Sequence, residues 1–487
     1  MSARHHLPWR TATAVAAMAL LAGCASVAPD GLRSDVQALA PGRAAGVPDA
    51  ALPAGGEGAR ADAQAAVQRW LAEPLTADAA VRIALLGNPG LQARLARLGV
   101  QDADRVRALT LPNPVFAIGR LTNAHEREIE RSLSFGLIDL VTLPWRSRWQ
   151  GQALQQATLA AAQDVARLAT DARRAWLNAV AAQQVLAAHE RMHDAAEAGA
   201  ELARRMVRVG HWSALQQARE QAALADSRSQ LAQARLAAAA TREALARTLG
   251  LWGEGARFTL ADRLPELPAQ PMDAEGIESR ALRERLDVRA ARLALARVAD
   301  QQGTSGIASV FGEIGVTYQR NTTTERTGAG HGDVQRGWEL AVPLPLLDWG
   351  GAAHARARLL TQEGAAQLQH TALQARTEAR TRWLAYRNAW DVARQQTQEV
   401  VPLRRFIQDE TLLRYNGMLA SVWDLLAEAR ASTGAVAQAV RAQRDFWLAE
   451  AELQYALTAG SATATATAAA TAPLDPPATA SVGAAGH

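Results

Sequence analysis

No proline interrupts this chain between Pro144 and Pro265, and that feature limits its fold more than any other. Alanine, leucine, glutamine, arginine and glutamate fill the stretch, and all of them favour helix. One helix over Trp145–Val209 would measure about 97 Å, and its counterpart over Trp349–Asn416 about 102 Å, kinked where Pro402 interrupts it. Helices of that length predict a rod, because they exceed the width of a compact domain.

The sequence also repeats itself. A shift of 207 residues aligns three kinds of feature in the two halves: alternating apolar residues, a Trp-Leu pair and a glycine. These are Leu133, Phe135 and Leu137 with Leu340, Val342 and Leu344, then Trp176-Leu177 with Trp383-Leu384, and Gly210 with Gly417. Further upstream a shift of 197 is better, and it aligns Ala84-Leu85 with Ala281-Leu282. The shift changes between a short polar connection, Asn123 to Glu128, and a longer one, Asn321 to Gln335. An insertion in a surface loop would account for the difference.

Each half is predicted to contain a helix, two strands, a very long helix, a turn and a returning helix. The first helices are expected over Thr76–Leu109 and Ile277–Gln302, and the returning helices over Ser213–Gly250 and Ala420–Thr458. The chain then divides into a signal peptide (1–23), a lipid-anchored N-terminal linker (24–75), a first repeat (76–250), a connector (251–276), a second repeat (277–460) and a disordered Ala/Thr/Pro tail (461–487). The predicted fold is mostly α with a small β part.

Four short stretches between the helices alternate with a period of two residues. One face of each is apolar and the other is small or polar, which is typical of a transmembrane β-strand. The residues expected to place these strands in the membrane are Phe116, Ile118, Leu133, Phe135, Ile314, Val316, Trp338 and Leu340. Trp145 and Trp349 follow the second and fourth stretches, where an interfacial aromatic belt would lie. The alternative is an ordinary pair of soluble hairpins packed on helices.

Four strands have a strong consequence if they cross a membrane. In hydrocarbon every backbone N–H and C=O must be paired, so a membrane sheet has to close on itself. Four strands cannot close, because single-chain barrels begin at about eight. Copies of the chain must therefore pool their strands, and three copies would give a twelve-stranded barrel.

The N-terminus has the pattern of an export signal. It combines a basic segment from Arg4 to Arg10, an apolar run from Thr11 to Ala22 that is too short to span a bilayer, and the ending Leu-Ala-Gly-Cys. This ending resembles the bacterial lipobox, in which the cysteine is acylated, so Cys24 is predicted to carry lipid, palmitate included. The resemblance also implies an outer-membrane destination, because Ala25 rather than aspartate follows the cysteine. The alternative is a free thiol in a mature domain.

The order of the motifs resembles the TolC-type outer-membrane efflux factor family over about residues 76–460. The motifs are Ala84-Leu85, Asn88-Pro89 and Leu91 in the first helix, Leu143-Pro144-Trp145-Arg146 and Pro345 to Gly351 at the strand-to-helix junctions, and Val209 to Ser213 and Asn416 to Ser421 at the tips. The resemblance implies a homotrimer with a twelve-stranded outer-membrane barrel above a periplasmic α-barrel built from the duplicated hairpins. It also implies docking to a periplasmic adaptor (membrane fusion) protein and to an inner-membrane pump of the RND type.

The turns between the long and returning helices are the expected docking tips. Glycine there can adopt the left-handed cap conformation, and Ser213 and Ser421 are predicted N-caps. The tip residues expected to contact the adaptor are Arg208, Val209, Gly210, Ser213, Arg414, Asn416, Gly417 and Ser421. Solvated arginine on an exposed helix end is the alternative for each arginine. The resemblance further implies a periplasmic gate of acidic residues, for which Asp424 matches one position and Ala427 departs at another.

One stretch has the form of an enzyme motif. His189-Glu190-Arg191-Met192-His193 is a formal H-E-x-x-H, which on a helix can hold zinc beside a general base. Its place within a long rod, without a third ligand or a counterpart at Gln396–Val400 in the other half, argues against that role. We therefore predict no metal site, no cofactor and no enzyme activity. A net charge of +4 over 487 residues does not favour nucleic-acid binding.

Two functions are compatible with these patterns. The first is the outer-membrane channel of a tripartite efflux system, a passive trimeric duct that exports small toxic compounds or metal ions and extends far into the periplasm. The alternative is a lipid-tethered periplasmic coiled-coil adaptor or scaffold without a pore. An adaptor would carry one helical hairpin flanked by soluble β-domains, whereas this sequence predicts two hairpins and strands with a lipid-facing pattern.

Overall fold

The computed structural model describes residues 26–39, 41–53, 57–122, 125–302, 314–325, 333–342 and 350–460. They fall into two compact units, and each unit takes segments from both halves of the duplication. Unit 1 comprises the described parts of Met1–Leu32, Leu95–Thr158 and Arg292–Leu368, and unit 2 those of Arg33–Arg94, Leu159–Ala291 and Gln369–His487. The predicted signal peptide, Cys24, Trp349 and the tail lie outside the described residues.

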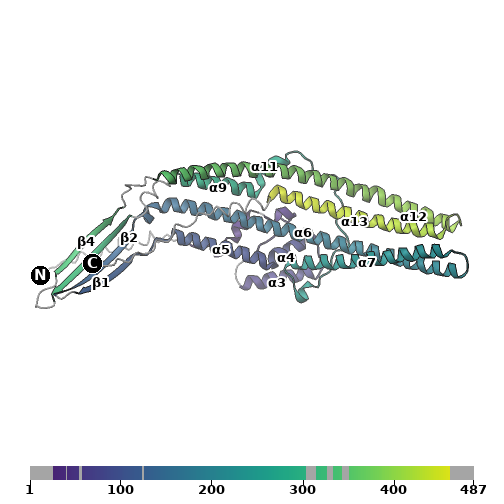
Figure 1. The fold of residues 1–487 in the computed structure, drawn as a ribbon, viewed down its shortest axis with the longest axis horizontal. Coiled ribbons are helices and arrows are strands. Elements are labelled where there is room, and N and C mark those ends of the chain that lie inside the picture. The colour runs from purple at the N-terminus through teal and green to yellow at the C-terminus, as the bar shows by residue number, and fades with distance from the viewer. Residues whose placement is uncertain are drawn as a thin grey trace. The chain divides into compact units, whose positions relative to one another are not determined.

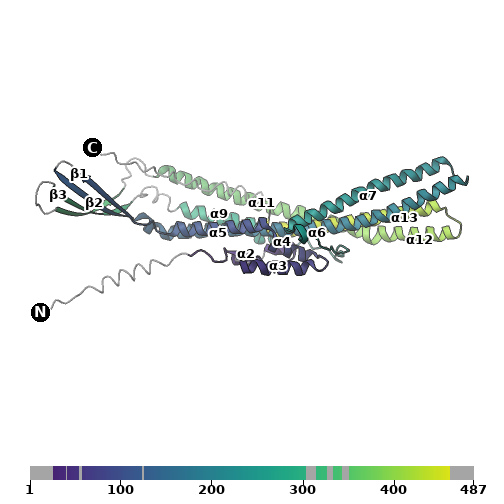
Figure 2. The same cartoon turned by 90° about the horizontal axis from the view of Figure 1, so that it is seen from below.

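The element order matches the predicted duplication (Figures 1 and 2). The helices of the first half are α4 (Ala77–Gly87), α5 (Pro89–Leu109), α6 (Ile138–Arg208) and α7 (Ala214–Leu249). Those of the second half are α8 (Ile277–Glu284), α9 (Leu286–Gln302), α11 (Gly351–Gln395), α12 (Val401–Asn416) and α13 (Val422–Thr458). The predicted fold class is confirmed, because the chain is mostly helical with one small four-stranded sheet.

The first long helix begins earlier than predicted. We expected it to start at Trp145, after Pro144, whereas α6 starts at Ile138 and contains the proline. The carbonyl of Leu137 accepts the N–H groups of Leu140 and Val141, both at 3.2 Å, so the first turn forms before the proline is reached. Pro144 then removes one backbone hydrogen bond without ending the helix.

The second long helix is interrupted near Pro402, as predicted. Between α11 and α12 lies one π turn, η3 (Gln396–Val400), and Pro402 is the second residue of α12. Proline has no N–H to donate to the preceding turn, and a wider turn there accommodates its ring. The equivalent part of α6 has no proline and remains α-helical.

The first helix of each half is two helices rather than the single one predicted. The break falls at Asn88, whose ψ is 116°, and at Arg285, whose ψ is 129°. Asn88 precedes a proline, which disfavours the helical conformation, whereas no proline follows Arg285. Both side chains reach the returning helix: Asn88 Nδ2 donates to the carbonyl of Thr248 (2.9 Å), and Arg285 Nη1 to that of Ala456 (3.1 Å).

Tryptophans tie the long helices to the segments that precede the first helices. Trp176 Nε1 on α6 donates to the carbonyl of Leu75 at 2.7 Å. Trp383 Nε1 on α11 donates to the carbonyl of Met272 at 3.2 Å. The tryptophans are 207 residues apart and the acceptors 197 apart, so the two shifts found in the sequence recur as matching contacts. Around Trp383, a buried cluster with Tyr386 and Phe446, whose rings are 5.3 Å apart, forms a core of unit 2.

Residues 33–71, within the predicted N-terminal linker, contain regular secondary structure. This segment forms α2 (Arg33–Ala38), the 3-10 turn η1 (Pro41–Ala45) and α3 (Glu57–Leu71). Val36 and Val47 are buried, and Arg173 Nη1 on α6 donates to the carbonyl of Ala45 at 2.8 Å. Apolar residues spaced among the prolines and glycines therefore pack the segment onto unit 2. The 251–276 connector holds one 3-10 turn, η2 (Gly253–Ala256).

The four strands form one antiparallel sheet in the order β1-β2-β3-β4. Their bounds are β1 (Val115–Thr122), β2 (Glu126–Gly136), β3 (Gly315–Glu325) and β4 (Asp333–Ala341). The polar connections predicted at Asn123–Glu128 and Asn321–Gln335 were therefore too long, because their ends belong to strands. Asn321 Nδ2, for example, donates across the sheet to Glu128 Oε1 at 3.1 Å, so polar residues here mark a sheet face rather than a loop.

Among the described residues, no helix is both long enough and apolar enough to cross a membrane.

Candidate functional site

One face of the sheet, which we call the apolar face, is built from rows of directly opposed residues. Phe116, Leu133, Tyr318 and Trp338 form one row, and the ring centroids of Tyr318 and Trp338 are 4.9 Å apart. Phe135, Val316 and Leu340 form the next row toward the helices. Most of these side chains are exposed in the single chain.

The predicted membrane residues lie together on this apolar face. Phe116, Ile118, Leu133, Phe135, Val316, Trp338 and Leu340 all occupy it by register. Ile314 immediately precedes β3, and its carbonyl accepts the N–H of Leu137 at 2.9 Å. The strands thus combine their separate alternating patterns into two adjoining apolar rows, and Ile118 lies in the row next to them.

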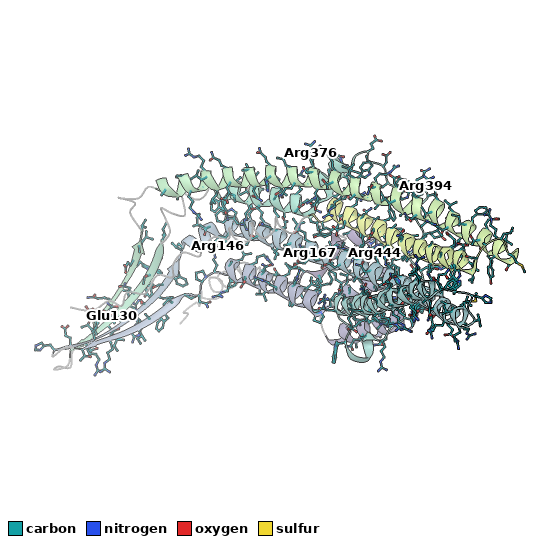
Figure 3. The ribbon with its side chains drawn as sticks, turned by 45° about the vertical axis from the view of Figure 1, so that its right-hand side comes forward. Glu130, Arg146, Arg167, Arg376, Arg394 and Arg444 are labelled. Carbon is teal, nitrogen blue, oxygen red and sulfur yellow. The ribbon has the colours of Figure 1, made fainter. Side chains whose placement is uncertain are left out.

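The opposite face, the polar face, carries hydroxyl, amide and carboxylate side chains. Thr317 Oγ1 donates to Ser134 Oγ at 3.1 Å, and Gln319 Nε2 donates to Glu339 Oε2 at 2.8 Å. Glu130, labelled on the sheet in Figure 3, lies on this face opposite Gly119. The acidic residues of the polar face are Glu126, Glu128, Glu130, Glu325, Asp333 and Glu339.

Arginines occupy the apolar face toward the turns that join the strands, and the sequence analysis missed them. Arg131, Arg320 and Arg336 are directly opposed on three adjacent strands, with Ile118 at the end of their row. Arg120 and Arg127 lie on the same face, nearer the β1–β2 turn. The sequence shows only isolated arginines within alternating stretches, and it takes the strand register to bring them into one row.

Both outer edges of the sheet remain open. Within the described part of the chain, β1 pairs only with β2, and β4 pairs only with β3. The outward N–H and C=O groups of β1 and β4 are therefore available to another chain, which is the arrangement that promotes edge-to-edge pairing.

The first hairpin tip, in unit 2, joins α6 to α7. Arg208 ends α6, Val209 is exposed, and Gly210 has the left-handed φ of 76°. The N–H of His211 donates to the carbonyl of Met206 at 2.9 Å, which closes the helix end. Ser213 then caps α7 in a reciprocal box with Gln216, as predicted for an N-cap.

The second hairpin tip repeats this geometry with a different residue at the left-handed position. We expected Gly417 to take it, but Gly417 has a φ of −81° and Met418 has the φ of 62°. The bond from the N–H of Leu419 to the carbonyl of Arg414 (2.8 Å) corresponds to the one that closes the first tip. The correct shift at the tips is thus 208 residues, which pairs Gly210 with Met418 rather than with Gly417.

The second tip exposes large apolar side chains. Met418 is 93% exposed and Leu419 is 83% exposed. Asn416 ends α12, and Ser421 caps α13 in a box with Asp424. The expected tip residues therefore lie at the two helix reversals, and Met418 and Leu419 join them as residues that the sequence analysis did not single out.

The two tips contact each other within unit 2. The ring centroids of Trp212 and Trp423 are 3.4 Å apart, and Arg430 Nη2 on α13 lies 2.5 Å from Glu220 Oε2 on α7. The α6–α7 and α12–α13 hairpins therefore reverse at the same end of unit 2 (Figures 1 and 2).

The predicted gate residue Asp424 has a local structural partner. Its Oδ2 accepts the N–H of Ser421 at 3.0 Å and the hydroxyl of Ser421 at 2.7 Å. These hydrogen bonds hold the pKa of the Asp424 carboxyl below its ordinary value of 3.8, so it is ionised at neutral pH. Gln216 occupies the equivalent position of the first tip and carries no charge.

The H-E-x-x-H stretch lies on α6 without the surroundings of a metal centre. His193 Nδ1 is 3.1 Å from Ser227 Oγ on α7, and burial lowers the pKa of His189, with a smaller effect from Arg441. No group of three metal-ligating side chains is found among the described residues.

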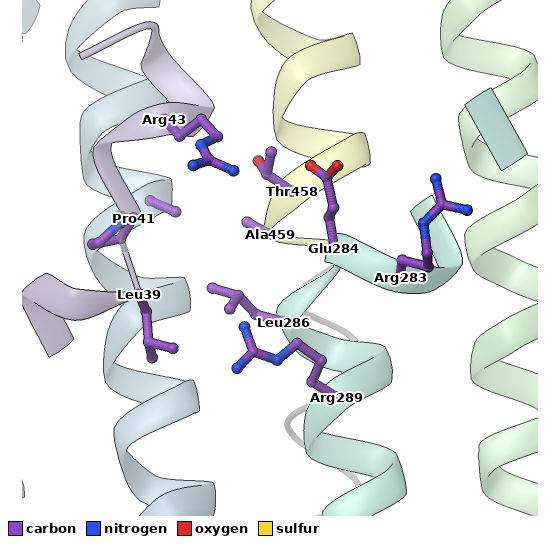
Figure 4. A pocket seen from close by; sticks show the side chains of 10 residues that line it. Leu39, Pro41, Arg43, Arg283, Glu284, Leu286, Arg289, Thr458 and Ala459 are labelled. Carbon is purple, nitrogen blue, oxygen red and sulfur yellow. The ribbon is translucent and has the colours of Figure 1, made fainter. Parts of the chain in front are cut away.

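A hollow of about 220 Å³ lies beside the end of α13 in unit 2 (Figure 4). Arg43, Arg283, Arg289 and Glu284 line it together with apolar residues. The hydroxyl of Thr458, also in the lining, donates to the carbonyl of Gln454 at 2.7 Å, so it is held in the helix. We find no arrangement of nucleophile and base there.

Comparison with known proteins identifies the fold. No protein-family model and no curated protein sequence matches the chain. Among solved structures, one similar protein is CusC, whose structures concern folding and transmembrane channel formation. The match covers 79% of this chain and 92% of the CusC chain, with a TM-score of 0.63 and 17% sequence identity. The match to the MtrE outer membrane channel of Neisseria gonorrhoeae covers 78% of this chain and 88% of MtrE, with a TM-score of 0.61 and 19% identity. The match to the CmeC outer membrane channel of Campylobacter jejuni covers 84% of this chain and 89% of CmeC, with a TM-score of 0.59 and 15% identity. The chain therefore has the fold of TolC-type outer-membrane channels.

Proposed function

We propose that this chain is the outer-membrane channel of a tripartite efflux system and works as a passive trimeric duct. The single observation that carries this proposal is the four-stranded sheet, with one apolar face, one polar face and two open edges. Such a sheet is stable in hydrocarbon only if its edges are paired, and three copies joined β4 to β1 would supply twelve strands. The fold shared with known outer-membrane channels supports the same arrangement.

In this trimer the apolar face would contact lipid and the polar face would line the pore. The pore wall would then carry the acidic residues of the polar face, which favour cations over anions. This charge suits positively charged small toxic compounds or metal ions as cargo. The duct needs no energy source of its own, because an inner-membrane pump would drive export.

The helical hairpins would form the periplasmic part of the duct, and their tips would dock a periplasmic adaptor protein and, through it, a pump of the RND type. Support comes from the exposed apolar residues Met418 and Leu419 and from Arg208 and Arg414 beside the helix reversals. Acylation of Cys24 would anchor each copy to the outer membrane from the periplasmic side.

Asp424 is our candidate for the periplasmic gate, where three copies would form an acidic ring. Its hydrogen bonds to Ser421 fix the carboxylate in place and keep it charged. Asp424→Asn preserves an acceptor for the cap while it removes the charge. Single-channel conductance unchanged by this substitution would exclude the charge of Asp424 from gating.

Disulfide trapping of the open edges tests the duct directly. In a Cys24→Ser background, which leaves no natural cysteine, Gly337→Cys on β4 is combined in turn with Ala117→Cys, Gly119→Cys or Leu121→Cys on β1. All four positions lie on the polar face, so a β4–β1 pair between copies would bring one combination within disulfide range. We expect covalent dimers and trimers from membranes on a non-reducing gel.

Each single-cysteine variant serves as a control and should stay monomeric on the same gel. If every combination remains monomeric, the sheet does not close between copies and the duct is excluded. Release of the Cys24→Ser chain as a soluble monomer would instead favour the lipid-tethered scaffold.

A further inference from the structure

The row of arginines on the apolar face needs an explanation beyond the duct. Like charges placed directly opposite each other on neighbouring strands destabilise a sheet, and Arg131, Arg320 and Arg336 are opposed in this way. The guanidinium of Arg131 lies 3.4 Å from the hydroxyl of Thr322. Within the described residues, none of the five arginines of this face forms an ion pair with a carboxylate of the chain.

The carboxylates of the sheet cannot neutralise these arginines, because they lie on the other side. Side chains of successive residues in a strand point to opposite faces. The register therefore separates the charges. Five arginines lie on the apolar face (Arg120, Arg127, Arg131, Arg320 and Arg336), and six carboxylates lie on the polar face (Glu126, Glu128, Glu130, Glu325, Asp333 and Glu339). An anion that pairs with these arginines would therefore come from outside the sheet.

The arginine row lies where an apolar band of membrane thickness would end. From Arg131 to Leu137 the strand rises about 16 Å, at about 3.4 Å per residue and a tilt of about 40°. From Ile138 to Trp145 helix α6 adds about 10 Å. Trp145 is exposed and would mark the periplasmic boundary. The sum is close to the apolar band of about 25 Å of a transmembrane barrel, so Arg131 falls at its outer boundary.

We propose that the arginine row binds the phosphate groups of a phosphorylated glycolipid in the outer leaflet of the membrane. Guanidinium groups bind phosphate through paired, charge-assisted hydrogen bonds. The acyl chains of the same lipid would lie along the adjoining row of Phe116, Leu133, Tyr318 and Trp338. A molecule with an anionic head and apolar chains matches both rows at once, whereas a soluble anion matches only the first. This inference rests on the proposed outer-membrane position of the sheet.

Binding of lipid A to the purified full-length trimer in detergent tests the inference. We expect bisphosphorylated lipid A to bind, and the triple substitution Arg131→Gln, Arg320→Gln and Arg336→Gln to weaken its binding by about tenfold or more. Lipid A from which both phosphates have been removed should bind the original protein as weakly as the triple variant binds the intact lipid. Glu128→Gln, Glu130→Gln and Glu339→Gln together change as many charges on the polar face and should leave binding unaltered.

Several results would overturn the inference. Equal affinity for lipid A with and without phosphates would mean that only its acyl chains contact the protein. Undiminished binding by the triple variant would mean that the phosphates do not bind to the arginine row. If the triple variant does not form trimers, the triple Arg→Lys variant and the single variant Arg336→Gln replace it. We expect both to lose part of their affinity for lipid A. Unaltered affinity in both would contradict binding by the arginine row. The disulfide test distinguishes the failure of this inference from the failure of the proposed function. If the chain forms disulfide-linked trimers but does not bind the phosphates of lipid A, only the lipid-binding inference is wrong.

Discussion

The two halves of the molecule stabilise the same structural feature, the break between the two short helices that begin each half, with different side chains. We call this break the joint. In the first half the neutral side chain of Asn88 sits at the helix break, donates to Thr248 and accepts the N–H of Leu91 at 3.1 Å. In the second half the break residue Arg285 is completely buried and makes two bonds to Asp287 (3.0 and 2.7 Å) and one to Glu378 (2.9 Å), besides that to Ala456. An amide and a buried ion cluster therefore produce the same backbone geometry.

The tips differ in a similar way. Gly210 adopts the left-handed conformation without steric cost, whereas Met418 adopts it with a side chain. Both tips close with matching hydrogen bonds and both returning helices begin with a capping box. The duplication thus repeats backbone geometry, while the side chains that secure it are free to differ in charge, size and strain.

The largest difference between the halves is expected at the joints. Arg285→Met removes the cation that bonds Asp287 and Glu378 and leaves the carboxylate of Asp287 buried without this partner, which costs about 3–5 kcal/mol. Asn88→Ala removes two neutral hydrogen bonds and costs about 1–2 kcal/mol. Hydrogen exchange of the amides of α8 and α13, compared with α4 and α7, measures the free energy of local opening at each joint.

Burial disfavours the charge of Arg285, but the bonds to Asp287 and Glu378 outweigh it and raise the pKa of the guanidinium. The double variant Arg285→Met with Asp287→Asn is the matched control, because it removes the charges of Arg285 and Asp287 together and leaves only the partly exposed Glu378. It should recover part of the loss. Equal losses for Arg285→Met and Asn88→Ala would contradict the distinction between the two joints.

A smaller effect is expected at the tips, and it should have opposite signs in the two halves. Met418→Gly relieves the left-handed strain and should stabilise the second tip by about 1 kcal/mol, whereas Gly210→Met should destabilise the first by about 1–2 kcal/mol. Protection of the last-turn amides of α12 and α6 against hydrogen exchange reports each change.

If Met418 is retained for docking, Met418→Gly should at the same time weaken adaptor binding, because it removes an exposed apolar side chain. Gly417→Ala is the matched control, since Gly417 has an ordinary φ. A stabilising effect of Gly417→Ala comparable to that of Met418→Gly would show that strain at Met418 is not its origin.

The fold was largely predictable from local patterns, whereas the sites depended on pairing between distant segments. Helix-forming composition and alternation located the long helices and strands, and Ser213 and Ser421 were recognisable as caps because capping is a local interaction. The left-handed residue at the second tip was missed, because a shift of one residue decides between Gly417 and Met418. The arginine row was missed for a related reason: Arg131 and Arg320 are far apart in sequence and become neighbours only through strand register.

The smallest predicted difference between the halves is in how the stability of the two tips depends on pH. In the second tip Asp424 accepts two bonds from Ser421, which lower the pKa of its carboxyl below 3.8, whereas Gln216 of the first tip does not titrate. A carboxyl whose pKa is lower in the folded state contributes stability above its ordinary pKa, and that contribution is lost as the pH falls through the folded-state pKa. Below about pH 4 the first turn of α13 should therefore lose protection against hydrogen exchange relative to the first turn of α7. Asp424→Asn, which keeps a cap acceptor without a titrating proton, should abolish this pH dependence, and a parallel loss of protection at both tips would contradict the assignment to Asp424.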